Sequence, residues 1–498
     1  MSREIARGAA WMVLMRIVDR GLGLVSTLVL ARLLVPADFG VMAMAMTFIA
    51  LIELAGAFNF DIVLIQRQNP SRDHYDTAWT LQLAFALFCG VTIAALAPAA
   101  AAFYNEPRLV PIMLVLGFAW GLTGLENIGI VNFRRDLNFA REFKFTIARR
   151  LLGFVVTLVL AFTLRSYWAL IAGIVTTRVA SVVLSYTMEP FRPRLSLAAR
   201  KDLFGFSGWM FVSNIIGFGL ARMTHFIVGR VNGPEALGLY SIASEMARLP
   251  STELSAPIIR AVLPGLSRVN DDPERWRALF IEVQGATIAL TLPTCIGLVM
   301  LAGPFVEVVL GMKWVDAIPV LIVLAIGGAL EVTTSNTGIA YLSLGKPRLI
   351  AAVNGTKLTV LGLLALWLVP AHGVIGMAFA ELGSALTAIL VSLPVVMRIA
   401  RIPVSQLAAA LWRPVTASAV MAAGLFELIG PPLAVSVDGP RSPAVLLGGI
   451  AAGGATYVAV MWVLWMLAGR PDGTERRVLK LGRETLARWW PSTRPDVH

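Results

Sequence analysis

The chain has 498 residues, of which 57% are hydrophobic and only 14% charged, and its mean hydropathy is +0.76. Soluble domains carry roughly 25% charged residues, which form a hydrated shell around the core. This composition therefore excludes a soluble globular protein, a disordered chain and a coiled coil, and it indicates a multi-pass membrane protein. The net charge of +12 reports on topology in such a protein, so no nucleic-acid partner is expected.

Apolar segments long enough to cross a bilayer, about 20 residues each, recur along the whole chain. The first carries Arg16, Asp19 and Arg20 and lacks a cleavage site, so it is expected to remain as a membrane helix rather than to act as a signal peptide. The sequence therefore predicts an all-α membrane protein with about fourteen transmembrane helices. They are expected over 10–34, 38–60, 78–103, 109–132, 143–164, 167–187, 206–231, 236–264, 279–304, 317–344, 348–369, 372–398, 412–430 and 443–468.

Basic residues outside these segments are distributed unevenly between the two sides. The N-terminus, every second connection and the C-terminal tail hold most of them. Because Lys and Arg stay on the cytoplasmic side, both termini are predicted to be cytoplasmic. The basic tail is expected to lie on the anionic lipids of that leaflet. The opposite connections hold only Arg108, Arg165, Arg230, Lys313 and Arg441.

An internal repeat relates the first six helices to the next six. A weaker match between the fourth and tenth helices pairs Asn127-x-Gly129 with Asn336-x-Gly338. An even-numbered repeat keeps its orientation, as in transporters whose substrate site lies between two parallel halves. The expected parts are lobes over 1–203 and 204–400, two further helices over 401–468 and a tail over 469–498. An offset of 198 residues pairs Trp11 with Trp209, Gly21 with Gly219, Arg32 with Arg230, Pro36 with Pro234 and Gly40 with Gly238.

Three turn and loop segments carry a family resemblance. They are LARLLVPADFG (30–40), IQRQNPSRDHYDTAW (65–79) and NFRRDLNFAREF (132–143). Over residues 1–400 the chain resembles the polysaccharide flippases of the multidrug/oligosaccharidyl-lipid/polysaccharide exporter superfamily, of the lipopolysaccharide type. The resemblance implies a V-shaped, MATE-like pair of six-helix bundles in a bacterial inner membrane. It also implies that a polyprenyl-phosphate-linked oligosaccharide moves to the outer leaflet by alternating access, for lipopolysaccharide or exopolysaccharide synthesis. A polysaccharide polymerase and glycosyltransferases would be partners.

Cations inside the apolar segments must pair or face water, because an isolated charge at mid-membrane costs roughly 2.5–3.5 kcal/mol. Asp19 and Glu245 are close enough to neutralise a neighbouring arginine. For Arg178 and Lys357, pairing between helices and lining of a cavity both stay open. A diphosphate favours arginine, whose planar cation donates two hydrogen bonds at once. The candidate cavity cations for the substrate phosphate are Arg16, Arg20, Arg178, Arg222, Arg248 and Lys357.

Carboxylates in the same segments are candidates for ion coupling. The chain has no phosphate-binding loop for ATP, and its four histidines do not cluster, so neither a cofactor nor a metal site is expected. The membrane potential, or a gradient of H⁺ or Na⁺, would drive transport. The candidate coupling residues are Asp19, Glu53, Glu126, Glu245, Glu331 and Glu381.

Three alternative functions stay open at this point. A peptidoglycan-precursor flippase is chemically adjacent, and a cation-coupled drug antiporter would share the architecture but require a net acidic cavity. A membrane polymerase or glycosyltransferase would need a sizeable outer loop that holds the sugar. The connections on that side are short and nearly uncharged, so the chain is not expected to be an enzyme.

Overall fold

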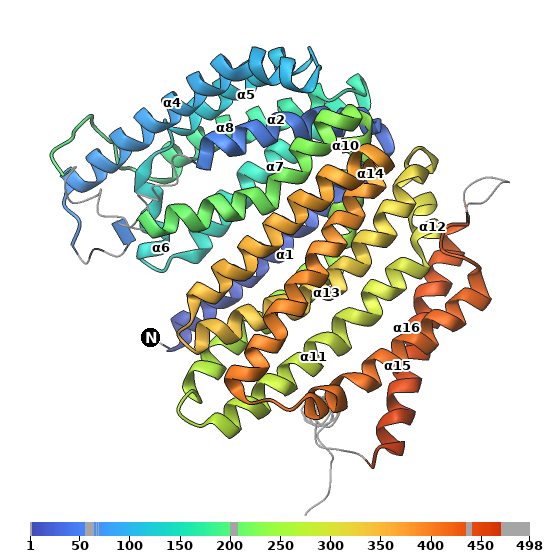
Figure 1. Cartoon of the computed structure of the whole chain (residues 1–498). Coiled ribbons are helices and arrows are strands. Elements are labelled where there is room, and N and C mark those ends of the chain that lie inside the picture. Colours follow the sequence, from blue (N-terminus) through green and yellow to red (C-terminus); the bar gives the residue numbers. More distant parts are fainter. Residues whose placement is uncertain are drawn as a thin grey trace, which may run out of the picture. The chain divides into compact units, whose positions relative to one another are not determined.

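The computed structural model describes residues 2–54, 64, 65, 67, 69–199, 208–434 and 441–469 (Figure 1). In this part of the chain the regular secondary structure consists of helices, without a strand. Each of the fourteen segments predicted from hydropathy lies largely on a helix. The predicted basic tail lies, beyond residue 469, outside the described residues.

The chain divides into two compact units, Met1–Ile242 and Ala243–His498, which we call unit 1 and unit 2. The division falls inside a single long helical run, α10. The four parts expected from the sequence stay a prediction.

Unit 1 is built from adjacent helices that pack in pairs. α4 packs on α5, α7 packs on both α1 and α8, and α5 also contacts α8. The helices of unit 1 are α1 (Ser2–Leu33), α2 (Pro36–Leu54), α4 (Arg72–Tyr104), α5 (Leu109–Thr123), η1 (Ile128–Ile130), α6 (Val131–Arg135), α7 (Phe139–Leu164), α8 (Trp168–Met188) and the first part of α10 (Gly208–Arg268).

Unit 2 continues α10 and adds a second set of packed helices. α13 packs on α14, and α11 packs on α13 and α15, while α15 also packs on α16. The helices of unit 2 are the rest of α10, α11 (Pro273–Met300), α12 (Ala302–Phe305), η2 (Val306–Leu310), η3 (Met312–Ala317), α13 (Ile318–Ser343), α14 (Pro347–Ala400), α15 (Val404–Ile429) and α16 (Pro443–Leu467).

Two helical runs each contain two of the predicted spans. α10 is interrupted at Gly233, where φ is 81°, and α14 at Gly373, where φ is 59°. Glycine adopts positive φ at little steric cost, so it joins two helices without an intervening loop. In the prediction from the sequence, Gly233 lies between two spans, and Gly373 is the second residue of the span over 372–398.

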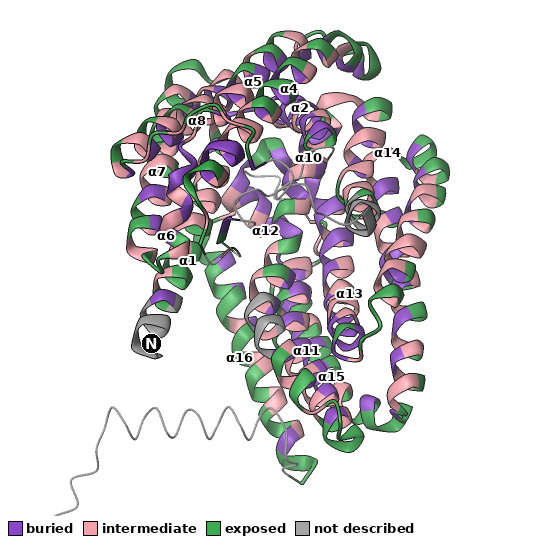
Figure 2. Ribbon diagram, turned by 90° about the vertical axis from the view of Figure 1, so that its left-hand side faces the viewer, coloured by how far each residue is buried: buried purple, intermediate pink, exposed green. Residues whose placement is uncertain are grey.

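The helices have the length and surface of membrane spans. Nine helices of the described part are long and apolar enough to cross a bilayer, or ten if a bent pair in unit 1 forms one span. The count of fourteen stays a prediction. Exposed residues occur along most helices (Figure 2), and many of them are large and apolar, for example Trp367 at 75% and Leu467 at 77%. Such surfaces fit contact with lipid, because water-soluble monomers rarely expose large apolar patches.

Candidate functional site

The two loops that carry the family resemblance meet at one end of unit 1. The Tyr75 hydroxyl, in the first turn of α4, donates to Asn132 Oδ1 over 2.6 Å. Arg135 Nη1 donates to the Tyr75 oxygen over 3.0 Å. Arg134 forms an ion pair with Glu142 across the turn between α6 and α7. The two motifs therefore form one scaffold that fixes α4, α6 and α7 against one another.

The segment after α8 is fastened to the same end of α4. The main-chain N–H groups of Arg194 and Ser196 donate to Asp76 Oδ1 and Thr80 Oγ1, each over 2.9 Å. Asp76 is buried and also pairs with Arg72 at 3.5 Å. Because side chains of α4 satisfy the main chain of this segment, it follows the helix instead of leaving it.

A sharp bend interrupts the predicted span over 109–132. α5 and the helical turns that begin at Ile128 are bent by 65° relative to each other. Asn127 lies at the bend and is fully buried. Its Oδ1 accepts from the Gly129 N–H over 3.0 Å, and its Nδ2 donates to the Phe191 carbonyl over 2.7 Å. The side chain thus caps the second helix and holds the segment that follows α8.

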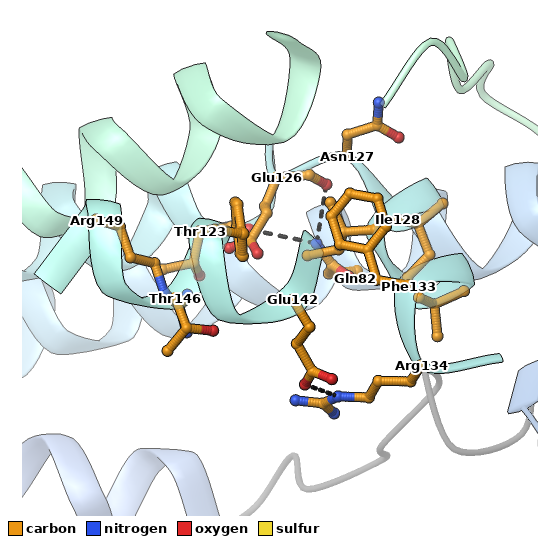
Figure 3. Close-up of a pocket in the computed structure, with 13 residues that line it drawn as sticks. Gln82, Thr123, Glu126, Asn127, Ile128, Phe133, Arg134, Glu142, Thr146 and Arg149 are labelled. Atoms are coloured by element: carbon orange, nitrogen blue, oxygen red, sulfur yellow. Dashed lines mark hydrogen bonds and ion pairs between the residues drawn. The ribbon is translucent and has the colours of Figure 1, made fainter. Parts of the chain in front are cut away.

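A pocket of about 340 Å³ lies at this bend, and we call it the bend pocket (Figure 3). A bend in a helix frees main-chain carbonyls. Here the amide of Gln82, on α4, donates to the carbonyls of Thr123 and Glu126 over 3.3 and 3.2 Å. The pocket is lined by Gln82, Thr123, Glu126, Asn127, Ile128, Ile130, Val131, Phe133, Arg134, Glu142, Phe145, Thr146 and Arg149.

The charged side chains of the bend pocket are not equivalent. Glu142 is paired with Arg134, as Figure 3 shows. Arg149, on α7, donates to the Ser181 hydroxyl of α8 over 2.9 Å. Glu126 lies beside the same Ser181, and within the described residues it forms no ion pair. Glu126 is therefore the carboxylate of this pocket that is left for a ligand.

A second polar cluster in unit 1 joins α2, α5 and α8. The indole N–H of Trp120 donates to Glu53 Oε1 over 2.7 Å. The Arg178 guanidinium lies 4.4 Å from the centroid of the same ring, which is a cation–π contact. The sequence left the partner of Arg178 open, and the structure shows that it is an aromatic ring bonded to a carboxylate.

The candidate arginines of α1 and α10 lie in a different environment. Asp19 forms an ion pair with Arg150 of α7 at 2.6 Å, although the sequence assigned it to a neighbour on its own helix. Arg16 and Arg20 are exposed, and Arg222 is half-buried. Within the described residues, no carboxylate forms an ion pair with Arg16 or Arg222.

The candidate cations of unit 2 are joined to carboxylates of other helices. Lys357 Nζ, on α14, lies 2.8 Å from Glu331 Oε1 on α13. Arg248, on α10, lies 3.1 Å from Glu381 Oε2, on α14 beyond its break. Glu245 is exposed. For Lys357, the alternative of pairing between helices is therefore the observed one.

The matched turns of the repeat contact each other reciprocally within unit 1. A Cβ atom on Gly40 would overlap the main-chain carbonyl of Pro234, and a Cβ atom on Gly238 would overlap that of Pro36. Only glycine allows the two backbones to approach so closely. The four residues are those that the repeat pairs, so the contact itself has two-fold character.

Sequence reasoning missed the residues whose role depends on a neighbouring helix. Trp120, Arg149, Arg150 and Gln82 acquire their partners from α2, α8, α1 and the bend. One signal was available, because Arg149 and Arg150 lie next to each other inside an otherwise apolar segment.

The long apolar helices and the charges within them define a multi-pass helical membrane protein. A solved structure described as "Lipid II flippase MurJ, inward closed conformation" matches with a TM-score of 0.72 and 13% identity. The match covers 92% of this chain and 100% of that one. The predicted fold class is thereby confirmed.

The chain belongs to the family of polysaccharide biosynthesis proteins. The family model described as "Polysaccharide biosynthesis protein" matches residues 29–319, more than half of the chain. The lipopolysaccharide biosynthesis protein WzxC of Escherichia coli K12 is 26% identical over 328 residues, 65% of this chain and 67% of that protein. The succinoglycan biosynthesis transport protein ExoT of Rhizobium meliloti is 25% identical over 344 residues, 68% and 69% of the two chains. The family resemblance predicted from the three loop motifs is confirmed.

Proposed function

We propose that this protein is a flippase, and not an enzyme, that moves a lipid-linked oligosaccharide from the cytoplasmic to the outer leaflet of a bacterial inner membrane. The relatives whose names include lipopolysaccharide and succinoglycan biosynthesis support the class of substrate. The distribution of basic residues supports cytoplasmic termini. A polymerase and glycosyltransferases that make and consume the oligosaccharide are the expected partners.

The observation that carries the proposal is the difference among the candidate cations. Arg16 and Arg222 form no ion pair with a described carboxylate, whereas Arg248 and Lys357 do. A cation in a membrane helix requires a counter-charge. The polyprenyl diphosphate of the substrate supplies it, and arginine binds two phosphate oxygens at once. We therefore assign first contact with the diphosphate to Arg16 and Arg222, and Arg20, four residues after Arg16 on α1, stays a predicted ligand.

Alternating access requires that some contact near the helix ends opens during the cycle. The reciprocal contact of Gly40 with Pro234 and of Gly238 with Pro36 is suited to this role. The contact consists of close backbone packing and involves no ion pair. Its separation therefore leaves no unpaired charge in lipid. On the predicted topology these turns lie at the outer ends of α2 and α10.

The driving force is the membrane potential, an ion gradient or both. Moving one negative charge outward against an inside-negative potential gains roughly 2.3 kcal/mol per 100 mV. The membrane potential therefore favours movement of a diphosphate out of the cytoplasmic leaflet. Ion coupling through one of the intramembrane carboxylates would add to it.

Two alternatives differ from this proposal in substrate and not in fold. A peptidoglycan-precursor flippase would carry a different saccharide on a similar lipid diphosphate. A drug antiporter would require unpaired carboxylates facing its ligand, but Glu331 and Glu381 are paired with cations. The paired state of these two acids favours an anionic substrate.

The test is flipping by the full chain in proteoliposomes. The probe is a polyprenyl diphosphate that carries a sugar with a nitrobenzoxadiazole fluorophore, and dithionite quenches only the outer-leaflet label. The protein should exchange this probe between leaflets, and it should leave labelled phosphatidylglycerol in place. Equal flipping of both lipids, or of neither, contradicts the proposed function. Equal rates with and without a potential and ion gradients contradict the proposed driving force.

A further inference from the structure

The bend pocket takes no part in the proposed binding of the diphosphate. It lies at the interrupted helix of unit 1, where a carboxylate, Glu126, faces a cavity of about 340 Å³. Broken helices in transporters commonly hold the coupling ion, because the break brings polar main chain and side chains into the membrane. The two main-chain carbonyls at this bend are already occupied by Gln82. The group that remains for a ligand is therefore the Glu126 side chain.

The charges around Glu126 decide which cation it would accept. Arg149 approaches it from α7, and Arg178 and Ser181 approach it from α8. Arg178 in turn lies near Glu53 of α2, and the Arg134–Glu142 pair lines the far side of the pocket. Two guanidinium groups repel a metal cation. Among the described residues, no group of three His, Cys, Asp or Glu could hold a metal ion.

A metal ion needs several ligands, whereas a proton binds to a single oxygen, so the one Glu126 carboxylate suffices to hold it. Water in the pocket can deliver a proton to a Glu126 carboxylate oxygen, which converts the group into a neutral acid. In this step a hydronium ion becomes water and a carboxylate becomes a carboxylic acid, so charge and atoms balance. The neutral acid no longer attracts Arg149.

A route for this change leads from the pocket to α1. Arg149 and Arg150 are consecutive on α7 and therefore point about 100° apart around the helix. Arg149 reaches Ser181 beside Glu126, and Arg150 reaches Asp19 on α1. Asp19 lies between Arg16 and Arg20 in the sequence. One pair of adjacent arginines thus connects the pocket to the helix that carries two of the proposed phosphate ligands.

We propose that the bend pocket is a proton-binding site, with Glu126 as the acceptor and the Arg149–Arg150 pair as the link to α1. This inference rests on the proposed function, because the linked helix is the one that binds the diphosphate. Protonation of Glu126 removes its attraction for Arg149, and the Arg150–Asp19 pair carries the resulting shift of α7 to α1. The site therefore regulates when the arginines of α1 hold the substrate.

The first experiment measures the initial flipping rate of the labelled polyprenyl diphosphate in proteoliposomes as a function of pH, with the potential held constant. For the wild type we expect one ionisation, with up to about a tenfold change in rate per pH unit on one side of it. Glu126→Gln should remove this dependence. Glu427→Gln, which changes an exposed carboxylate on α15, should keep the wild-type profile.

The second experiment separates proton binding from coupling and does not depend on transport. Infrared difference spectra of the purified full chain between acidic and neutral pH should show a carboxyl band that Glu126→Gln lacks. Arg150→Gln should keep this band but lose the pH dependence of flipping. A wild-type band that persists in Glu126→Gln, or a Glu126→Gln variant with the wild-type pH profile, overturns the inference. Absence of flipping by the wild type would instead overturn the proposed function.

Discussion

Units 1 and 2 differ in how the candidate cations of their membrane helices are paired. In unit 2 the candidate cations Lys357 and Arg248 are neutralised by Glu331 and Glu381 of other helices. In unit 1, Arg16 and Arg222 form no ion pair with a described carboxylate, and Arg178 stacks on Trp120. A paired cation stabilises the bundle, whereas a cation without a carboxylate is available to an anionic ligand. The comparison supports our proposal that unit 1 provides the substrate contacts.

The Asn-x-Gly motif that the repeat matches between the two units also differs in structure between them. Asn336, in unit 2, lies inside the continuous helix α13, and its Nδ2 donates to Gln284 over 2.8 Å. Asn127, in unit 1, lies at a 65° bend and caps the helix that follows. The same Asn-x-Gly pattern therefore forms a straight, packed helix in one unit and a pocket in the other.

The largest effect is expected from unpairing a charge in unit 2. Lys357→Ala leaves Glu331 without its cation, and an unpaired charge within a membrane helix is destabilising by about 3 kcal/mol. We expect a marked loss of folded protein in thermal unfolding measured in detergent. The double variant Lys357→Met with Glu331→Gln should recover most of the stability. If the single and double variants are equally stable, the pair is not structural and the contrast between the units is lost.

A substitution of a unit 1 cation should act on transport and leave the fold intact. Arg222→Gln removes a charged hydrogen bond to phosphate, worth about 1.5–3 kcal/mol, and should slow flipping about 10- to 100-fold. Arg20→Gln should act in the same direction. The amount of protein in the membrane and its melting temperature should match the wild type. Loss of protein from the membrane would show that Arg222 has a structural role, as Lys357 does.

Overpacking the reciprocal glycine contact should have an intermediate effect. Gly40→Ala and Gly238→Ala place a methyl group against a carbonyl, and overpacking costs about 1–3 kcal/mol. Once one methyl group has pushed the two turns apart, the second causes less overlap. The effects of the two substitutions on the melting temperature should therefore be less than additive. Gly217→Ala, where a Cβ atom meets nothing within 4 Å, is the matched control. Strict additivity, or an equal effect of the control, would contradict a single two-fold contact.

The smallest effect concerns the ion pair between Arg108 and Glu106 in the turn between α4 and α5. Arg108 donates to both carboxylate oxygens of Glu106 over 2.8 Å, and these bonds hold the pKa of Glu106 below its usual range. Since the folded pKa is lowered, the stabilisation is present above the unfolded pKa of about 4.3. It is lost as the pH falls through the folded value. Melting curves of the wild type and Arg108→Gln should therefore converge below about pH 4. A difference that persists in acid would contradict this origin.

The sequence predicted the helices well because hydropathy and length report directly on what the bilayer requires. It also placed boundaries between spans close to the breaks in α10 and α14: Gly233 lies between two predicted spans, and Gly373 is the second residue of the span over 372–398. It missed the bend at Asn127, because the segment is apolar enough overall to form one span and the fixing of the Asn127 side chain depends on Phe191, far away in the chain. The loop motifs identified the family but did not reveal that Tyr75 and Asn132 bond to each other.

The sequence predicted which charged residues belong to the candidate site, but it did not predict which residues they pair with. The chain contains too many intramembrane carboxylates for spacing to assign them to cations. Lys357 and Glu331 are 26 residues apart, and Arg248 and Glu381 are 133 residues apart. Arg178 could not be assigned at all, because its partner is an indole ring. Such pairings depend on the packing of helices, which hydropathy does not encode.

Affinity for the lipid diphosphate tests the contrast between the units most directly. The measurement is the dissociation constant of an unlabelled polyprenyl diphosphate for the purified full chain, obtained by native mass spectrometry. Arg16→Gln with Arg222→Gln should weaken binding about 100-fold or more, if each contact is worth at least 1.5 kcal/mol. Arg248→Gln with Glu381→Gln should leave the constant unchanged. Equal weakening by both double variants, or by the second alone, would contradict the assignment of the diphosphate to unit 1.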